Sequence, residues 1–319
     1  MNPNDRLKSP GTALGISIAM ACAAVNAAPA ATQTKVLFED QHIRFVEVTR
    51  WPGEKAPEPA EPYSAVIATD AAWPAVTEQP LDAKTSAHET FGNRGGAANQ
   101  QPYPWCQTHG ALAAREVTVQ GNFPQHFYRF EYKRIDGENF AANWKTWYPW
   151  ILDPAPKVKD LGTTPQSGAP YSKQWPYPLV YDAVHAAPAN HFVRFEDDHI
   201  QLVEVVVRTG ETENMHGHPY SSVYANDGAG PTEERGAVDV NKTLAPAEAP
   251  IWGKRGEAPP GGHYPDCLAA IPEPPHQVST KQGPPEHFYR LQFKRLDGED
   301  IKSKWHDWYP LTAKSANSK

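Results

Sequence analysis

The spacing of apolar and polar residues predicts short strands along the chain. From 200 to 207, apolar residues fall on both parities, which is typical of a strand covered on both faces. From 287 to 294, apolar and polar residues alternate, as in a strand with one face toward solvent. Turn residues follow at 210–211 and 226–228. This pattern favours an all-β fold, a small barrel or sandwich.

The pattern occurs twice, so the chain contains an internal repeat. Similar segments stand 157 residues apart early in the copies and 161 residues apart later, namely 38–43 with 195–200, 46–48 with 203–205, 125–129 with 286–290 and 144–149 with 305–310. We expect two homologous domains, at 35–152 and 189–311, joined by a proline-rich connector at 153–188 and followed by a tail at 312–319. Each copy ends in a Trp-x-x-Trp-Tyr-Pro motif, which favours a short terminal helix whose aromatic residues cover a barrel end.

The composition agrees with two folded domains and excludes some partners. The 319 residues exceed the length of one typical domain. The 33 prolines disfavour a helical bundle, because proline breaks long helices. The 37 acidic residues outnumber the 30 basic ones, giving a net charge of −7, so there is no basic surplus for a phosphate backbone. We therefore expect no nucleic-acid partner.

Residues 1–28 have the organisation of a cleaved export signal. Arg6 and Lys8 precede an apolar stretch at 13–25, and small residues follow it. The alternatives are an uncleaved anchor and a lipid-modified Cys22, to which the preceding residues are a poor fit. No other segment approaches the roughly 20 apolar residues of a membrane-spanning helix. We expect a periplasmic or secreted protein with no transmembrane segment.

One segment contains residues that can bind a metal ion. Gly210 precedes His216 and His218, whose spacing places both imidazoles on one face of a strand. Tyr220 and Tyr224 continue that face and are the candidates to orient a substrate or move a proton. Two neutral imidazoles from one strand form half of a site for a divalent transition metal, Fe, Mn, Zn, Ni or Cu.

These residues resemble the motifs of the cupin superfamily. Gly210 followed by His216-x-His218 matches the first cupin motif, and His276, before Thr280 and Gly283, is similar to a relaxed second motif. The resemblance covers both repeat units. It implies two tandem antiparallel β-barrels of the jelly-roll type, a bicupin.

The resemblance also implies three metal ligands, His216, His218 and His276. Cupin sites typically add a glutamate shortly after the first pair, and here Ser222 or Val223 stands in its place. This leaves two alternatives, a three-histidine site and a site that has lost its metal.

Comparison of the two units favours a retained site in the second. Pro59, Glu61 and Arg115 stand opposite the three histidines in the first unit. Joint loss is expected of residues that act as a set, so we expect the first domain to be a degenerate partner. In the opposing interpretation, the two histidines of the first motif merely line the barrel and hydrogen-bond to Tyr220 or Tyr224.

Three further histidines and one glutamate are weaker candidates for a role in the metal site. His126 and His287 occupy equivalent positions in both units, including the one without a site, which indicates a structural role. His287 is also the candidate fourth ligand. Glu213 and His263 are weaker candidates for contacts behind the ligands or for proton transfer.

Two cysteines remain after removal of the signal. Cys106 and Cys267 are equivalent in the repeat, and an exported protein is in an oxidising compartment. A disulfide requires both to lie near the pseudo-two-fold axis that relates the units. The alternative is two buried thiols.

The sequence thus predicts an exported bicupin with a transition metal in its second barrel and a small-molecule ligand or substrate. Three protein ligands leave coordination positions open, which suits oxygenase, isomerase or decarboxylase chemistry. The alternative is a non-catalytic ligand-binding or structural bicupin of the cell envelope. The sequence leaves the metal, the substrate and homo-oligomer formation open.

Overall fold

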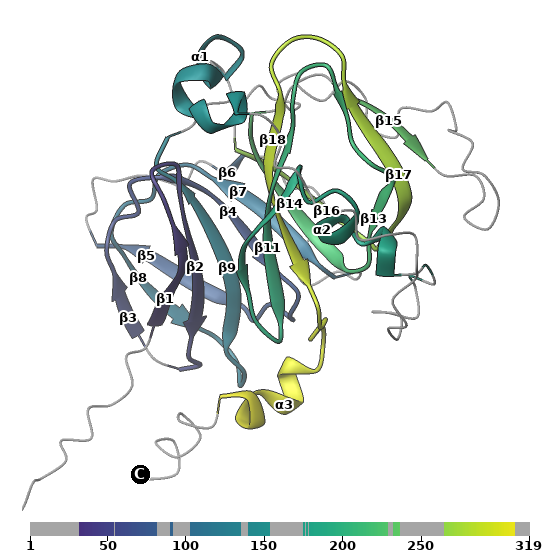
Figure 1. Ribbon diagram of the computed structural model, residues 1–319. Helices are drawn as coiled ribbons and strands as arrows, with labels where there is room; N and C mark the ends of the chain where they lie inside the picture. Colours follow the sequence, from purple (N-terminus) through teal and green to yellow (C-terminus); the bar gives the residue numbers. More distant parts are fainter. Residues whose placement is uncertain are drawn as a thin grey trace, which may run out of the picture.

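Antiparallel strands dominate the computed structural model (Figure 1). The structure describes residues 32–53, 55–81, 90–91, 103–134, 140–153, 175, 177, 179–228, 232–236 and 265–309. The predicted signal, most of the connector and the tail lie outside these residues. The all-β prediction is confirmed.

The first unit is a sandwich of two antiparallel sheets. The larger sheet has the order β1 (Thr32–Glu39), β2 (Ile43–Arg50), β9 (Gln125–Tyr132), β4 (Ser64–Thr69), β7 (Trp105–His109) and β6 (Thr90–Phe91). The smaller sheet has the order β3 (Lys55–Glu58), β8 (Arg115–Val119) and β5 (Val76–Pro80).

The second unit repeats this arrangement. Its larger sheet has the order β10 (His191–Glu196), β11 (Ile200–Val207), β18 (Glu286–Phe293), β14 (Ser221–Gly228) and β16 (Asp266–Ala270). Its smaller sheet has the order β12 (Glu211–Thr212), β17 (Glu273–Thr280) and β13 (His216–His218), with β15 (Glu233–Gly236) also paired to β17. Both units follow the same strand order, as expected of tandem jelly-roll barrels.

Strand β11 is buried along its whole length, as predicted, but two details differ from the sequence prediction. The polar face of β18 was expected to meet solvent, yet Arg290 and Gln292 are fully buried, because the second unit's interior is itself partly polar. The expected turn at 226–228 is instead the irregular end of β14, which stays paired with β18 through Gly228.

The two large sheets pack face to face through an apolar layer. Phe45 and Phe130 of the first unit belong to one buried cluster with Leu202 and Leu291 of the second. Alternate residues of the same strands, such as Phe127, point into the interior of their own sandwich. The layer between the units is therefore the main core of the molecule.

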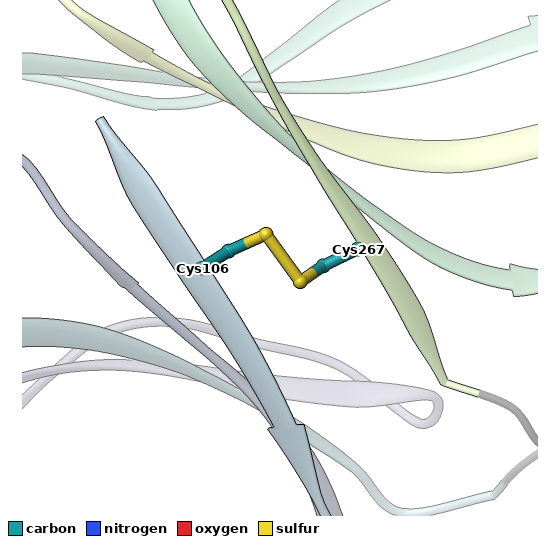
Figure 2. The surroundings of a disulfide bond; sticks show 2 residues. All are labelled: Cys106 and Cys267. Carbon is teal, nitrogen blue, oxygen red and sulfur yellow. A yellow bond between two sulfur atoms is a disulfide. The ribbon is translucent and has the colours of Figure 1, made fainter. Parts of the chain in front are cut away.

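A disulfide crosses this layer. Cys106 on β7 and Cys267 on β16 are buried and bonded, with their Cα atoms 6.3 Å apart (Figure 2). Of the two alternatives for these cysteines, the structure has the bridge. Equivalent positions can meet because both strands lie beside the axis that relates the units.

Short helices lie outside the sheets: α1 (Phe140–Trp147), the 3-10 turns η1 (Pro149–Leu152) and η2 (Leu179–Tyr181), α2 (Ala183–Ala186) and α3 (Ile301–Trp308). Each terminal helix packs against the unit to which it does not belong. Phe140 of α1 clusters with Val206, whereas Trp305 of α3 clusters with Trp51 and Phe123. The two units thus exchange helices. No helix among the described residues is long and apolar enough to cross a bilayer.

The exchange inserts Tyr148 into a buried histidine cluster at the interface. Its ring lies 4.1 Å from that of His42 and 4.2 Å from that of His287, and its hydroxyl donates to Asp227 at 2.6 Å. The ring nitrogens of His287 lie 3.2 Å from Asp227 and 2.8 Å from Glu204. Burial lowers the pKa of His287, but the two carboxylates outweigh it and raise the pKa to about 10. The imidazolium is therefore an ionic link inside the interface.

Loss of this charge should destabilise the fold at high pH. The folded pKa of His287, about 10, lies above its ordinary value of 6.5, so its stabilisation is complete below about pH 6.5 and is lost as pH rises through 10. Between about pH 7 and pH 10, the wild type should lose at least about 1 kcal/mol more unfolding free energy than His287→Gln, measured by urea denaturation. His185→Gln, at an exposed position, is the control and should follow the wild type. Equal slopes for wild type and His287→Gln would contradict the ionic link.

The bridge predicts the thiol content of the mature chain. The denatured protein lacking residues 1–28 should show no titratable thiol before reduction. After reduction it should show two. The double variant Cys106→Ser/Cys267→Ser should lose about 2–5 kcal/mol of unfolding free energy, because the bridge restricts the unfolded chain. Two thiols before reduction would disprove the bridge.

Candidate metal centre

Strands β13 and β17 bring the three predicted histidines together inside the second sandwich. The strands pair antiparallel, with His216 opposite His276 and His218 opposite Glu273 after an irregularity. Gly217 separates the two histidines of β13, and a Cβ atom at this position would lie 2.9 Å from the carbonyl oxygen of Glu273. The close contact between the strands therefore requires glycine between the histidines.

A fourth histidine joins the three. The ring centroids of His216 and His276 lie 4.6 Å apart, and His218 lies 5.2 Å from the first and 5.4 Å from the second. His191, at the start of β10, lies 4.6 Å from His216 and 5.4 Å from His218. All four side chains are buried. Donor atoms of His191, His216 and His218 lie within 4.8 Å of one another, as do those of His218, His276 and Glu273.

Backbone carbonyls fix the orientation of three of these rings. The contacts join Nδ1 of His216 to Asn214 O at 2.8 Å, Nδ1 of His276 to Pro274 O at 2.9 Å and Nδ1 of His191 to Ala187 O at 3.2 Å. A carbonyl only accepts, so Nδ1 carries the proton and Nε2 keeps its lone pair. This is the support that metal-binding histidines commonly have, and it fits the donor set to a metal ion.

Burial also keeps the histidines in the form that binds metal. It lowers the pKa of His191 to about 3 and that of His218 well below the ordinary value, and nearby Arg290 adds to both effects. Burial lowers the pKa of His216 in the same way, together with His276 and His191. Neutral imidazole is the ligand form, so these residues need not release a proton to take an ion.

Two carboxylates approach the histidines from separate elements. Glu213, between β12 and β13, has an oxygen 3.9 Å from Nε2 of His216 and another 3.5 Å from Nδ1 of His191. Glu273 on β17 has an oxygen 3.9 Å from Nε2 of His218. Each histidine of β13 therefore has a carboxylate oxygen 3.9 Å from its Nε2.

Glu273 is held by an arginine and a tyrosine. The hydroxyl of Tyr224 donates to its carboxylate at 2.7 Å, and Nη1 of Arg290 donates to it at 2.9 Å and also to the Tyr224 hydroxyl. Arg290 is fully buried, and its Nε and Nη2 have no hydrogen-bond partner among the described residues. Burial raises the pKa of Glu273, but Arg290 and His276 outweigh it and lower the pKa.

The space between these groups is the size of an ion. The cavity lined by the four histidines, Glu213, Tyr224 and Arg290 has a volume of about 20 Å³. A cavity needs roughly 10–15 Å³ for one water molecule. The described conformation therefore encloses a space for an ion or a single water.

The other predicted site residues lie elsewhere. Tyr220 lies in the turn between β13 and β14 and is not among the described residues that line the cavity. His287 projects from β18 on the face opposite Arg290, toward the interface, where carboxylates bind both ring nitrogens. His263 lies outside the described residues.

Sequence reasoning missed His191 and Glu273. His191 precedes the repeated segment and belongs to no motif. Glu273 stands three residues before His276, and this spacing is a signal that could have indicated it.

A further group of metal-type donors occurs at the interface. Nε2 of His199 lies 2.8 Å from Asp70 and 3.4 Å from Asp297. Burial lowers the pKa of His199, but the contact with Asp70 outweighs it and raises the pKa. A histidine that favours its proton is a poor metal ligand, so this group fits an ion pair better than a metal site.

In the first unit, ion pairs occupy the positions of the histidines. Nη2 of Arg115 lies 2.5 Å from Glu61, and Nη1 of Arg129, the equivalent of Arg290, lies 2.9 Å from the same carboxylate. The described residues of this sandwich's interior form no group of metal donors. The interiors of the two units therefore have different chemistry.

Comparison with known proteins supplies no close relative. No family model and no curated protein sequence matches the chain. Among solved structures, a cupin 2 conserved barrel domain protein from Leptotrichia buccalis is 6% identical, with 82% of this chain and 88% of that chain covered and a TM-score of 0.23. An oxalate decarboxylase from Bacillus subtilis is 13% identical over 91% of this chain and 80% of that chain, with a TM-score of 0.24.

A cupin domain from Bordetella pertussis is 11% identical and covers 33% of this chain and 96% of its own, with a TM-score of 0.25. All three similarities are weak, with identities of 6–13% and TM-scores of 0.23–0.25.

Proposed function

We propose that the second barrel binds one divalent transition metal ion through His216, His218 and His276, with His191 completing the set. One observation carries this proposal: backbone carbonyls engage Nδ1 of three of these histidines, which leaves their Nε2 lone pairs available beside an ion-sized cavity. Imidazole donors suit Fe, Mn, Zn, Ni and Cu.

We further propose that the exported bicupin uses this ion on a small polar molecule. When bound, the ion would supply Lewis-acid or O₂ chemistry of the oxygenase, isomerase or decarboxylase type. Arg290 offers two buried nitrogens, Nε and Nη2, that no described residue binds, and they suit an anionic substrate group such as a carboxylate. The Tyr224 hydroxyl, between Arg290 and Glu273, is placed to pass a proton to the Glu273 carboxylate.

One observation favours the alternative of a non-catalytic metal-binding bicupin. The cavity of about 20 Å³ has room for an ion but not for an ion and a substrate together. Catalysis therefore requires the cavity to enlarge, whereas metal binding alone requires no such change.

Metal content tests the proposal. Protein purified without a histidine tag and refilled separately with Fe(II), Mn, Zn, Ni and Cu should hold about one ion per chain of at least one metal, by elemental analysis. His216→Ala/His218→Ala should abolish binding, and His191→Ala should weaken it, because these changes remove donors. His185→Ala, on the exposed side of α2, is the matched control and should retain the ion.

Absence of metal in the wild type after all five refills would contradict the proposal. Bound metal without turnover of a panel of small hydroxy and carboxylic acids would support the non-catalytic alternative. Turnover that disappears in His216→Ala/His218→Ala would support the enzyme.

Export is proposed from residues 1–28. The chain recovered from the exported fraction of a bacterial host should have the mass of a protein lacking these residues. A variant that starts at residue 29 should stay inside the cell. A full-length mass in the membrane fraction would instead support the uncleaved anchor.

A further inference from the structure

The interior of the first sandwich holds a larger cavity than that of the second. Its volume is about 230 Å³. At about 30 Å³ for each water molecule, this is room for seven or eight waters, or for one small organic molecule. Arg115 and Arg129, which line it, are the equivalents of His276 and Arg290, so the cavity occupies the position of the metal centre.

One side of the cavity offers a buried donor. Arg115 is 3% exposed and uses Nη2 to bind Glu61 and Glu58, at 2.5 Å and 3.2 Å. Its Nη1 has no hydrogen-bond partner among the described residues. A buried guanidinium N–H without an acceptor is costly, so a ligand oxygen at this atom would be strongly favoured.

A pair of buried acceptors also lines the cavity. Nδ1 of His109 contacts the carbonyl oxygen of Gly110 at 2.7 Å, so Nδ1 carries the proton and Nε2 has a lone pair. Nε2 of His109 and Oε2 of Glu61 have no partner among the described residues and lie 4.0 Å apart. One donor with two hydrogens, such as an ammonium group, can reach both atoms at ordinary hydrogen-bond distances.

Charge and shape restrict the ligand further. The connected ion pairs around the cavity balance, with four arginines against four glutamates: Arg44, Arg50, Arg115, Arg129, Glu58, Glu61, Glu78 and Glu131. A ligand without net charge preserves this balance. Ile67, Trp73 and Phe127 form an apolar part of the wall.

We propose that this cavity binds a zwitterionic α-amino acid with an apolar side chain, without a metal ion. The carboxylate would accept from Nη1 of Arg115, the ammonium group would donate to His109 and Glu61, and the side chain would contact Trp73 and Phe127. The first barrel is then a second ligand site and not only a structural partner. This inference does not depend on the metal site of the second barrel.

Calorimetry with L-valine as the probe tests the inference on the full mature chain. Valine should bind with a Kd of about 1 mM or tighter and should raise the melting temperature. Two matched probes, the 2-hydroxy acid and the amine with the same carbon skeleton, each lack one recognised group. They should bind at least about tenfold more weakly, because each leaves one buried partner unsatisfied.

Variants locate the site. Arg115→Lys keeps the charge but has one nitrogen in place of three, and His109→Phe removes the Nε2 acceptor, so each should weaken valine binding at least about tenfold. His216→Ala/His218→Ala, in the other barrel, should bind valine like the wild type. No binding of valine at about 10 mM, equal or tighter binding of the hydroxy acid, or loss of binding only in the second-barrel variant would overturn the inference.

Discussion

The face-to-face packing of the two large sheets is the interaction on which the rest of the molecule depends. Burial of apolar side chains on both sides, Phe45 and Phe130 against Leu202 and Leu291, fixes the pseudo-two-fold axis. The disulfide lies in the same layer. Because every strand of these sheets presents alternate residues to the layer and to its own interior, one face of each sheet is constrained while the other is free to differ.

The interiors of the two units differ in their side chains. In the second, neutral histidines leave lone pairs around an ion-sized space; in the first, arginine–glutamate pairs surround a cavity of about 230 Å³. Yet both units keep a buried histidine beside a carboxylate and a tyrosine from the other unit's terminal segment: His287 with Glu204 and Tyr148, and His126 with Glu47 and Tyr309. The two interiors thus keep an arginine in common, Arg129 and Arg290, but differ where Arg115 stands in place of His276.

The all-β class, the two units and the convergence of His216, His218 and His276 were predictable, because strand periodicity and a local motif encode them. His191 was not, because it reaches the site through the pairing of β10 with β11 and the closure of the sandwich. The place of His287 could have been predicted, since its parity on β18 is opposite to that of Arg290. The exchange of helices was not predictable, because an aromatic motif shows that a surface will be covered but not which one.

The exchanged helices give a single chain the architecture of a swapped dimer. Two copies that trade terminal segments across a two-fold axis form a domain-swapped homodimer. Here α1 and α3 are exchanged between two units of a single polypeptide. In a homodimer any substitution appears in both pockets, whereas in this chain one pocket can change without the other while the exchanged helices keep the two units in contact.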